Sequence, residues 1–153
     1  MSRPITTLDL GHPHPAAPQQ QDKSRYLVPL GRLFFVLIFL TTFTHFQAQT
    51  IAYAAQQGVP LASIAVPLSG VIALAGAISV LIGYRAKVGA WLLVLFLVPV
   101  TLALHRFWGL SDPMAAALQR AMFLKNLSML GGALLIAYFG AGPISVDAAR
   151  KRG

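Results

Sequence analysis

Four long apolar runs constrain what this chain can fold into. They cover about residues 27–46, 62–83, 88–105 and 119–139. A helix rises about 1.5 Å per residue, so a run of roughly 20 residues crosses the ~30 Å hydrocarbon core of a bilayer. Backbone groups find no water there and must pair within helices or closed barrels. The runs therefore predict an all-α fold, a transmembrane four-helix bundle with short loops, in one domain of residues 25–147.

The composition agrees with a membrane protein. Hydrophobic residues make up 56% of the 153 residues and charged residues only 10%, and the mean hydropathy is +0.67. Soluble domains carry about 25% charged residues. Lys and Arg outnumber the acids by 12 to 4, but no basic face with interleaved aromatic residues occurs outside the apolar runs. The composition predicts the lipid bilayer as a partner and excludes nucleic acid.

The chain ends are predicted to lie outside the bundle. Residues 1–24 contain four prolines and few apolar side chains, so we expect a disordered cytoplasmic tail. His12 and His14 lie in this tail, but histidines on a proline-rich segment are usually solvated, and we expect no metal site. Residues 148–153 form a basic cytoplasmic tail. The first run lacks a small-residue cleavage site, which favours a spanning helix over a signal peptide.

Lys and Arg residues are distributed unevenly between the two sides of the predicted bundle. The N-terminal flank, the turn at 84–87 and the C-terminal tail carry most of them, whereas the loop at 47–61 carries none. Positively charged loops stay on the cytoplasmic side. Both termini are therefore predicted to face the cytoplasm, although Arg106 and Arg120 on the opposite side depart from the pattern.

The absence of cysteine removes one group of functions. Disulfides, thiolate-bound iron–sulfur clusters and cysteine nucleophiles all require cysteine, so any redox chemistry would need a bound cofactor. No serine, histidine and acid converge in the pattern, and every acidic residue lies outside the apolar runs. We therefore do not expect the chain to be an enzyme on its own. The acidic residues are Asp9, Asp22, Asp112 and Asp147.

Small residues predict how the helices pack. In lipid, the close approach of helices depends on small side chains at helical spacing. Ser69, Ala73 and Ala77 recur every four residues in the second run, which is therefore predicted to be the central packing helix. Gly131 and Gly132 in the fourth run are interpreted as a second packing notch. Such faces also permit a homo-oligomer.

Three runs bring polar side chains to a common depth. His45 ends the first run, His105 ends the third, and Lys125 and Asn126 lie one to two turns into the fourth. With the termini inside, all four residues fall in the outer half of the bilayer. An unpaired lysine at the bilayer centre costs about 2.5 to 3.5 kcal/mol, so Lys125 either extends to the headgroups or faces the bundle interior. Asn126 is too short to extend and favours an interior ligand site.

Two further residues complete the set of candidates. Trp108 lies shortly after His105 and is interpreted as part of an outer aromatic belt. The alternative is that it packs against the ring of a ligand. Arg32 lies about one turn into the first run and is interpreted as an anchor or a site at the inner side. The candidate ligand-binding residues are therefore His45, His105, Lys125, Asn126 and Trp108, with Arg32 at the opposite face.

Several segments together resemble the DoxX family of bacterial four-helix integral membrane proteins over about residues 25–147. The positions that match the family pattern are Arg32, His105, Lys125, Asn126 and Asp147. The second run departs from it, because it has Ala73 and Leu74 where such proteins often hold an acidic residue. The segments that carry the resemblance are PLGRLFFVLIF, QQGVP, LSGVIALAGAISVLIGYRAKVGAWLL, ALHRFW and FLKNLSMLGGALLIAYFGAGPISVD.

The resemblance implies a multi-pass protein of the bacterial cytoplasmic (inner) membrane. It implies an accessory or scaffold subunit of a membrane-associated redox or oxidative-stress system, with a soluble or membrane redox protein as partner. The alternative is a subunit of an oxidoreductase that binds quinone or another lipophilic ligand, with Lys125, Asn126 and His105 donating hydrogen bonds to it. Haem b between His45 and His105 is a less favoured cofactor, and transport is a less favoured function.

Overall fold

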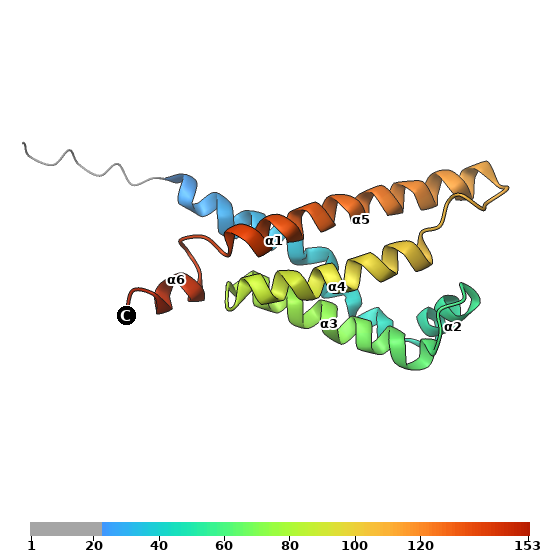
Figure 1. Cartoon of the computed structure of the whole chain (residues 1–153), viewed down its shortest axis with the longest axis horizontal. Helices are drawn as coiled ribbons and strands as arrows, with labels where there is room; N and C mark the ends of the chain where they lie inside the picture. The colour runs from blue at the N-terminus through green and yellow to red at the C-terminus, as the bar shows by residue number, and fades with distance from the viewer. Residues whose placement is uncertain (1–22) are drawn as a thin grey trace, which may run out of the picture.

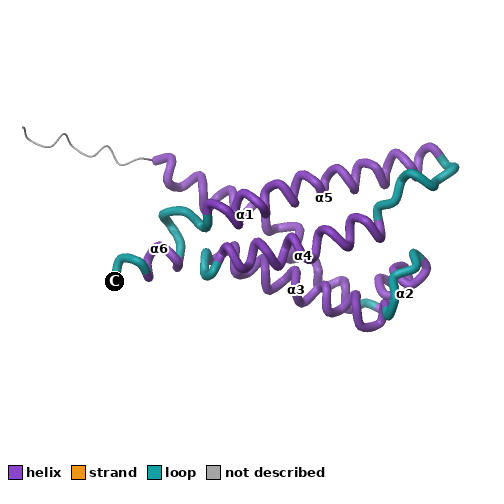
Figure 2. The backbone as a smooth tube through the Cα atoms, in the orientation of Figure 1, coloured by secondary structure: helices purple, strands orange, loops and turns teal. Residues whose placement is uncertain are grey.

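Residues 23–153 are described by a computed structural model, and helices make up the regular structure of this part of the chain (Figure 1). Four helical segments are long and apolar enough to cross a membrane, which confirms the predicted all-α transmembrane four-helix bundle. Figure 2 shows that short loops join them. The helices are α1 (Leu27–Leu40), α2 (Ala48–Gln56), α3 (Ala62–Ile82), α4 (Ala86–Leu104), α5 (Pro113–Phe139) and α6 (Val146–Arg150).

The bundle has two ends that differ in content. One end, here called the terminal end, holds the start of α1, the α3–α4 turn, the end of α5 and α6 (Figure 1). The other, the loop end, holds α2 and the loop between α4 and α5. The predicted disordered tail lies almost wholly outside the described residues; its last two residues, Lys23 and Ser24, begin a short 3-10 helix that ends at Tyr26.

The first spanning segment changes its helical form before it ends. After α1 the chain continues as the 3-10 helix Thr41–Phe46. The hydroxyls of Thr41, Thr42 and Thr44 each donate to the carbonyl three residues earlier. Such local side-chain bonds compete with the ordinary helical pattern, and the 3-10 form is the common result near a helix end. This segment places His45 at the loop end.

Two elements differ from the predicted bounds. The segment predicted as a loop over 47–61 contains α2, which buries Ala54 against α3. Helix α5 begins six residues earlier than predicted, at Pro113. The carboxylate of Asp112 accepts hydrogen bonds from the backbone N–H groups of Met114 and Ala115, and proline suits the first helical position. An N-cap followed by proline was therefore a start signal that the apolar run alone did not reveal.

Helix α3 is the central packing helix, as its small residues predicted. It packs on α1, α2 and α4, and α4 in turn packs on α5. Ala73 and Ala77 of α3 are fully buried, and Gly76 meets Gly89 of α4 so closely that a Cβ on Gly76 would lie 2.8 Å from the Gly89 carbonyl oxygen. Helices α1 and α5 share far less contact, and Phe35 against Gly132 marks a close approach between them.

The terminal end is tied together by Asp147. Its two carboxylate oxygens accept hydrogen bonds from the backbone N–H groups of Arg85 (2.8 Å) and Ala86 (3.0 Å), at the start of α4. Its own N–H donates to the carbonyl of Gly83 at the end of α3. A carboxylate is stabilising beside the unpaired N–H groups of a helix N-terminus. Asp147 therefore docks α6 on the α3–α4 turn.

Candidate functional site

A cavity of about 160 Å³ lies at the loop end, between the Thr41–Phe46 segment, α4 and α5. Four of the sequence-predicted candidates line it, namely His45, His105, Lys125 and Asn126. They come from three separate apolar runs, and the helix packing brings them to one space. The sequence therefore predicted the charged and imidazole residues that line this cavity, and their binding of a ligand stays a prediction.

His45 is held in place by α3. A Cβ on Gly70 would lie 2.9 Å from the Cβ of His45, so the absence of a side chain at Gly70 makes room for the histidine. The hydroxyl of Ser69 donates to the carbonyl of Val66 (2.7 Å) and therefore accepts from Nδ1 of His45 (3.2 Å). In the neutral ring this leaves Nε2 as a hydrogen-bond acceptor.

His105 is positioned in a similar way by α5. Its Nδ1 lies 2.8 Å from Oε1 of Gln119, an acceptor, so Nδ1 carries the proton. The neutral ring again keeps Nε2 as an acceptor. Both histidines are thus fixed through Nδ1, and each retains one nitrogen that no described residue engages.

Asn126 is buried and fixes α5 on α4. Only 4% of its surface is exposed, and its Nδ2 donates to Oγ1 of Thr101 (3.0 Å). The Thr101 hydroxyl donates onward to the carbonyl of Leu97 (2.6 Å). A buried amide must be hydrogen-bonded to offset its desolvation. This pair therefore sets the register of α5 at the cavity.

Lys125 provides the formal charge of the cavity. The side chain is exposed, and its ammonium group makes one weak contact, 3.5 Å to the sulfur of Met122. The residues that line the cavity include no Asp or Glu. The cavity therefore combines one cation, one carboxamide and two imidazoles that keep an acceptor nitrogen, a set that favours a ligand with a negatively charged or carbonyl acceptor beside a hydrogen-bond donor.

Sequence reasoning missed part of the cavity wall. Thr41, Thr42 and Thr44 line it on the side of the first segment, and Phe96 and Val100 line it on α4. The TTFT sequence before His45 was a usable signal. Three hydroxyl residues near the end of an apolar helix favour a 3-10 turn, and this turn places His45 beside the cavity. The apolar residues carried no signal, since they look like any lipid-facing or core position.

The remaining candidates lie elsewhere. Trp108 is not a lining residue; it packs with Phe107 and Phe123 in a cluster of edge-on rings and is largely exposed. Arg32 is at the terminal end and is buried, with 5% of its surface exposed. Its Nη2 donates to the carbonyl of Ile144 (2.7 Å), so it connects α1 to the segment that precedes α6.

Comparison with known proteins decides the family. The model of the SURF4 family matches residues 12–152, nearly the whole chain. The chain belongs to the SURF4 family. No solved structure matches it.

Two curated relatives of this SURF4-family chain differ in length and source. The ER-derived vesicles protein ERV29 of Saccharomyces cerevisiae is 29% identical over 138 residues, which are 90% of this chain and 38% of the yeast protein. The inner membrane protein YphA of Escherichia coli is 29% identical over 98 residues, 64% of this chain and 69% of that protein. The chain thus spans little more than a third of the yeast relative's length.

Membership of the SURF4 family overturns the resemblance to the DoxX family. The accessory or scaffold role in a redox or oxidative-stress system depended on that resemblance and is wrong, and the quinone-binding subunit of an oxidoreductase conflicts with the SURF4 family and is wrong as well. A redox protein as partner stays a prediction. The error has a physical source. Membrane bundles share apolar helices, small packing residues and basic flanks because the bilayer demands them, so short segments of this kind do not separate one family from another.

Proposed function

We propose that this SURF4-family chain is a membrane receptor in trafficking, which binds a client polypeptide through the cavity at its loop end. The observation that carries the proposal is the convergence of Lys125, Asn126, His45 and His105 on one space without an acidic residue. The name of the yeast relative assigns that protein to ER-derived vesicles. We extend membrane trafficking to this chain from that relationship.

The size of the cavity limits what it holds. Sites for whole drug-sized ligands measure about 300 to 1,000 Å³, whereas this cavity measures about 160 Å³. It therefore suits one residue or an end group of a longer molecule. The Lys125 ammonium would donate to a carboxylate or carbonyl, and the histidine Nε2 atoms would accept from N–H groups. A polypeptide offers both kinds of partner on adjacent atoms.

The distribution of positive charge indicates which side of the membrane the cavity would face. Lys and Arg residues gather at the terminal end, in the α3–α4 turn and after α6, and such residues favour the cytoplasmic side. The cavity would then open in the outer half of the bilayer, where a client on the non-cytoplasmic side reaches it. The E. coli relative is by name an inner membrane protein, so for this chain we propose the bacterial inner membrane.

Replacing Lys125 tests the proposal. The variant Lys125→Met keeps an unbranched chain and removes the charge. Loss of a hydrogen bond to a charged group costs about 1.5 to 3 kcal/mol, which is roughly a 10- to 150-fold loss of affinity. We expect recovery of the client polypeptide, cross-linked in membranes before solubilisation and quantified by mass spectrometry, to fall by about tenfold or more.

The matched control is Arg120→Met. It removes one positive charge from the same helix at an exposed position that does not line the cavity, and it should leave client recovery unchanged. The variant Lys125→Arg should retain part of the recovery. If the same polypeptides are recovered in equal amounts from Lys125→Met and Arg120→Met, the receptor role of this cavity is refuted.

A further inference from the structure

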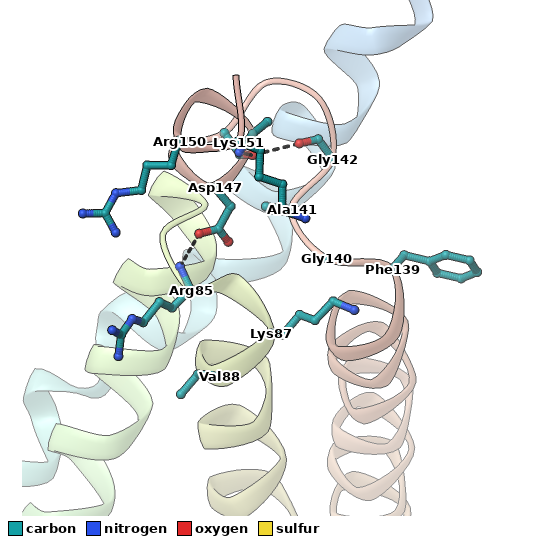
Figure 3. A pocket seen from close by; sticks show the side chains of 12 residues that line it. Arg85, Lys87, Val88, Phe139, Gly140, Ala141, Gly142, Asp147, Arg150 and Lys151 are labelled. Carbon is teal, nitrogen blue, oxygen red and sulfur yellow. Dashed lines mark hydrogen bonds between the residues drawn. The ribbon is translucent and has the colours of Figure 1, made fainter. Parts of the chain in front are cut away.

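A second and larger cavity lies at the terminal end. It measures about 730 Å³, is open to the surface, and is bounded by the start of α4, the end of α5 and the segment that includes α6 (Figure 3). Its walls are mixed: Val88, Phe139 and Ala141 provide apolar surface, and four cationic residues surround it. The cations are Arg85, Lys87, Arg150 and Lys151.

The acidic residue of this cavity does not balance these charges. The lining contains Asp147, and both of its carboxylate oxygens already accept hydrogen bonds from backbone N–H groups at the start of α4. Four cations and one carboxylate leave a formal excess of three positive charges. The site is therefore strongly cationic, and its acid is engaged in holding α6.

The cations occupy two sides of the cavity. Lys87 points toward the end of α5, where its ammonium donates to the carbonyl of Tyr138 (2.7 Å) (Figure 3). Arg85 and Arg150 extend on the other side of Asp147, and both guanidinium groups lie within 6 Å of the Tyr84 ring centre, at 5.8 and 4.9 Å. Two guanidinium groups beside one ring repel each other, and a bound anion relieves that repulsion.

A buried cation lies behind the wall. Arg32 is fully enclosed at Nε and Nη1, and neither atom has a hydrogen-bond partner within the described chain. A Cβ on Gly83 would clash with Nη1 of Arg32 and would lie 2.5 Å from the Cβ of Ser145, a lining residue. Asp147 attracts this buried charge through space without a hydrogen bond to Nε or Nη1, and the charge adds to the positive potential at this end.

We propose that this cavity binds an anionic phospholipid. Arg85 and Lys87 lie at the start of the spanning helix α4, near the level of the bilayer phosphates, and Arg150 and Lys151 at the end of α6 line the same cavity. Basic pockets between transmembrane helices recognise anionic headgroups. The headgroup phosphate lies among the cations, and the beginning of an acyl chain packs on Val88 and Phe139, both of which are more than half exposed. A free phosphate ion would use the charges but leave this apolar surface uncovered.

Paired charge-removal variants test the proposal in the full chain. Native mass spectrometry would follow phosphatidylglycerol and phosphatidylcholine bound to protein released from nanodiscs that contain both lipids. The unaltered chain is expected to retain phosphatidylglycerol selectively. Each basic residue near a membrane surface contributes about 1 kcal/mol of attraction, so Arg150→Gln with Lys151→Gln should weaken retention of phosphatidylglycerol by roughly 30-fold.

The control removes the same charge from the loop end. Arg106→Gln with Arg120→Gln should leave phosphatidylglycerol retention unchanged, because neither residue lines the cavity. Equal retention of both lipids by the unaltered chain, or equal loss in the two double variants, overturns the proposal. So does displacement of the lipid by millimolar inorganic phosphate, since that result would show that the apolar contact contributes nothing.

Discussion

At the scale of single residues, Arg32 is the least satisfied group in the described chain. One of its nitrogens donates to the Ile144 carbonyl, while Nε and Nη1 are buried without partners. A buried unpaired N–H costs about 1 to 3 kcal/mol, and a hydrogen bond from a charged donor contributes about 1.5 to 3 kcal/mol. Arg32 has two unpaired N–H groups and one hydrogen bond, so the cost of burying the unpaired groups exceeds the stabilisation from the bond.

Arg32→Met should therefore raise the free energy of unfolding, by about 1 kcal/mol. Methionine keeps the length of the side chain, and the Ile144 carbonyl can turn to solvent because that residue is exposed. Reversible unfolding in mixed micelles would measure the change, with the exposed Arg25→Met as a control that stays within ~0.5 kcal/mol. A loss of 2 kcal/mol or more would show that Nε and Nη1 are bonded in the membrane.

The residues of the loop-end cavity show what the sequence could and could not predict. Lys125 and Asn126 stand out in any apolar run, because a polar group in hydrocarbon requires a partner. The hydrogen-bond partners of the cavity residues were harder to predict. Thr101 is the acceptor for Asn126, and Gln119 is the acceptor for His105. Both are ordinary residues whose role depends on how the helices cross. That crossing is a property of the packed bundle.

At the scale of elements, the contact between α3 and α4 depends on two glycines. A Cβ on Gly89 would lie 2.5 Å from the Ser79 hydroxyl oxygen, and a Cβ on Gly76 would lie 2.8 Å from the Gly89 carbonyl oxygen. Small-residue spacing predicted the central role of α3. It could not predict α2, whose nine residues are too few to stand out, nor the early start of α5, because Asp112 and Pro113 lie outside its apolar run.

Glycine-to-alanine substitutions at two positions should have opposite effects on the free energy of unfolding. Gly76→Ala forces α3 away from α4, because its Cβ would lie 2.8 Å from a backbone oxygen and 3.0 Å from Leu93, and overpacking costs about 1 to 3 kcal/mol. Gly131→Ala meets nothing within 4 Å and should stabilise α5 by about 0.5 to 1 kcal/mol. Unfolding free energies in mixed micelles would compare them. Equal effects of the two variants would contradict the close α3–α4 contact.

At the scale of the whole molecule, four spanning helices enclose a polar cavity at one end and a cationic cavity at the other. The architecture was predictable because the bilayer permits few solutions for four apolar runs. The family was not, because the same constraint makes unrelated bundles look alike over short segments. Helices α1 and α5 make little contact with each other, and a client would enter the loop-end cavity between them.

Cysteine labelling tests the central claim, that the polar cavity at the loop end opens on the non-cytoplasmic side. The chain has no cysteine, so single replacements need no altered background. Lys125→Cys lines the cavity, whereas Leu127→Cys lies on the same helix, is half exposed, and does not line it. A membrane-impermeant methanethiosulfonate added outside intact cells should label Lys125→Cys and leave Leu127→Cys unlabelled. Equal labelling of the two, or labelling of Lys125→Cys only from the cytoplasmic side, would contradict the account.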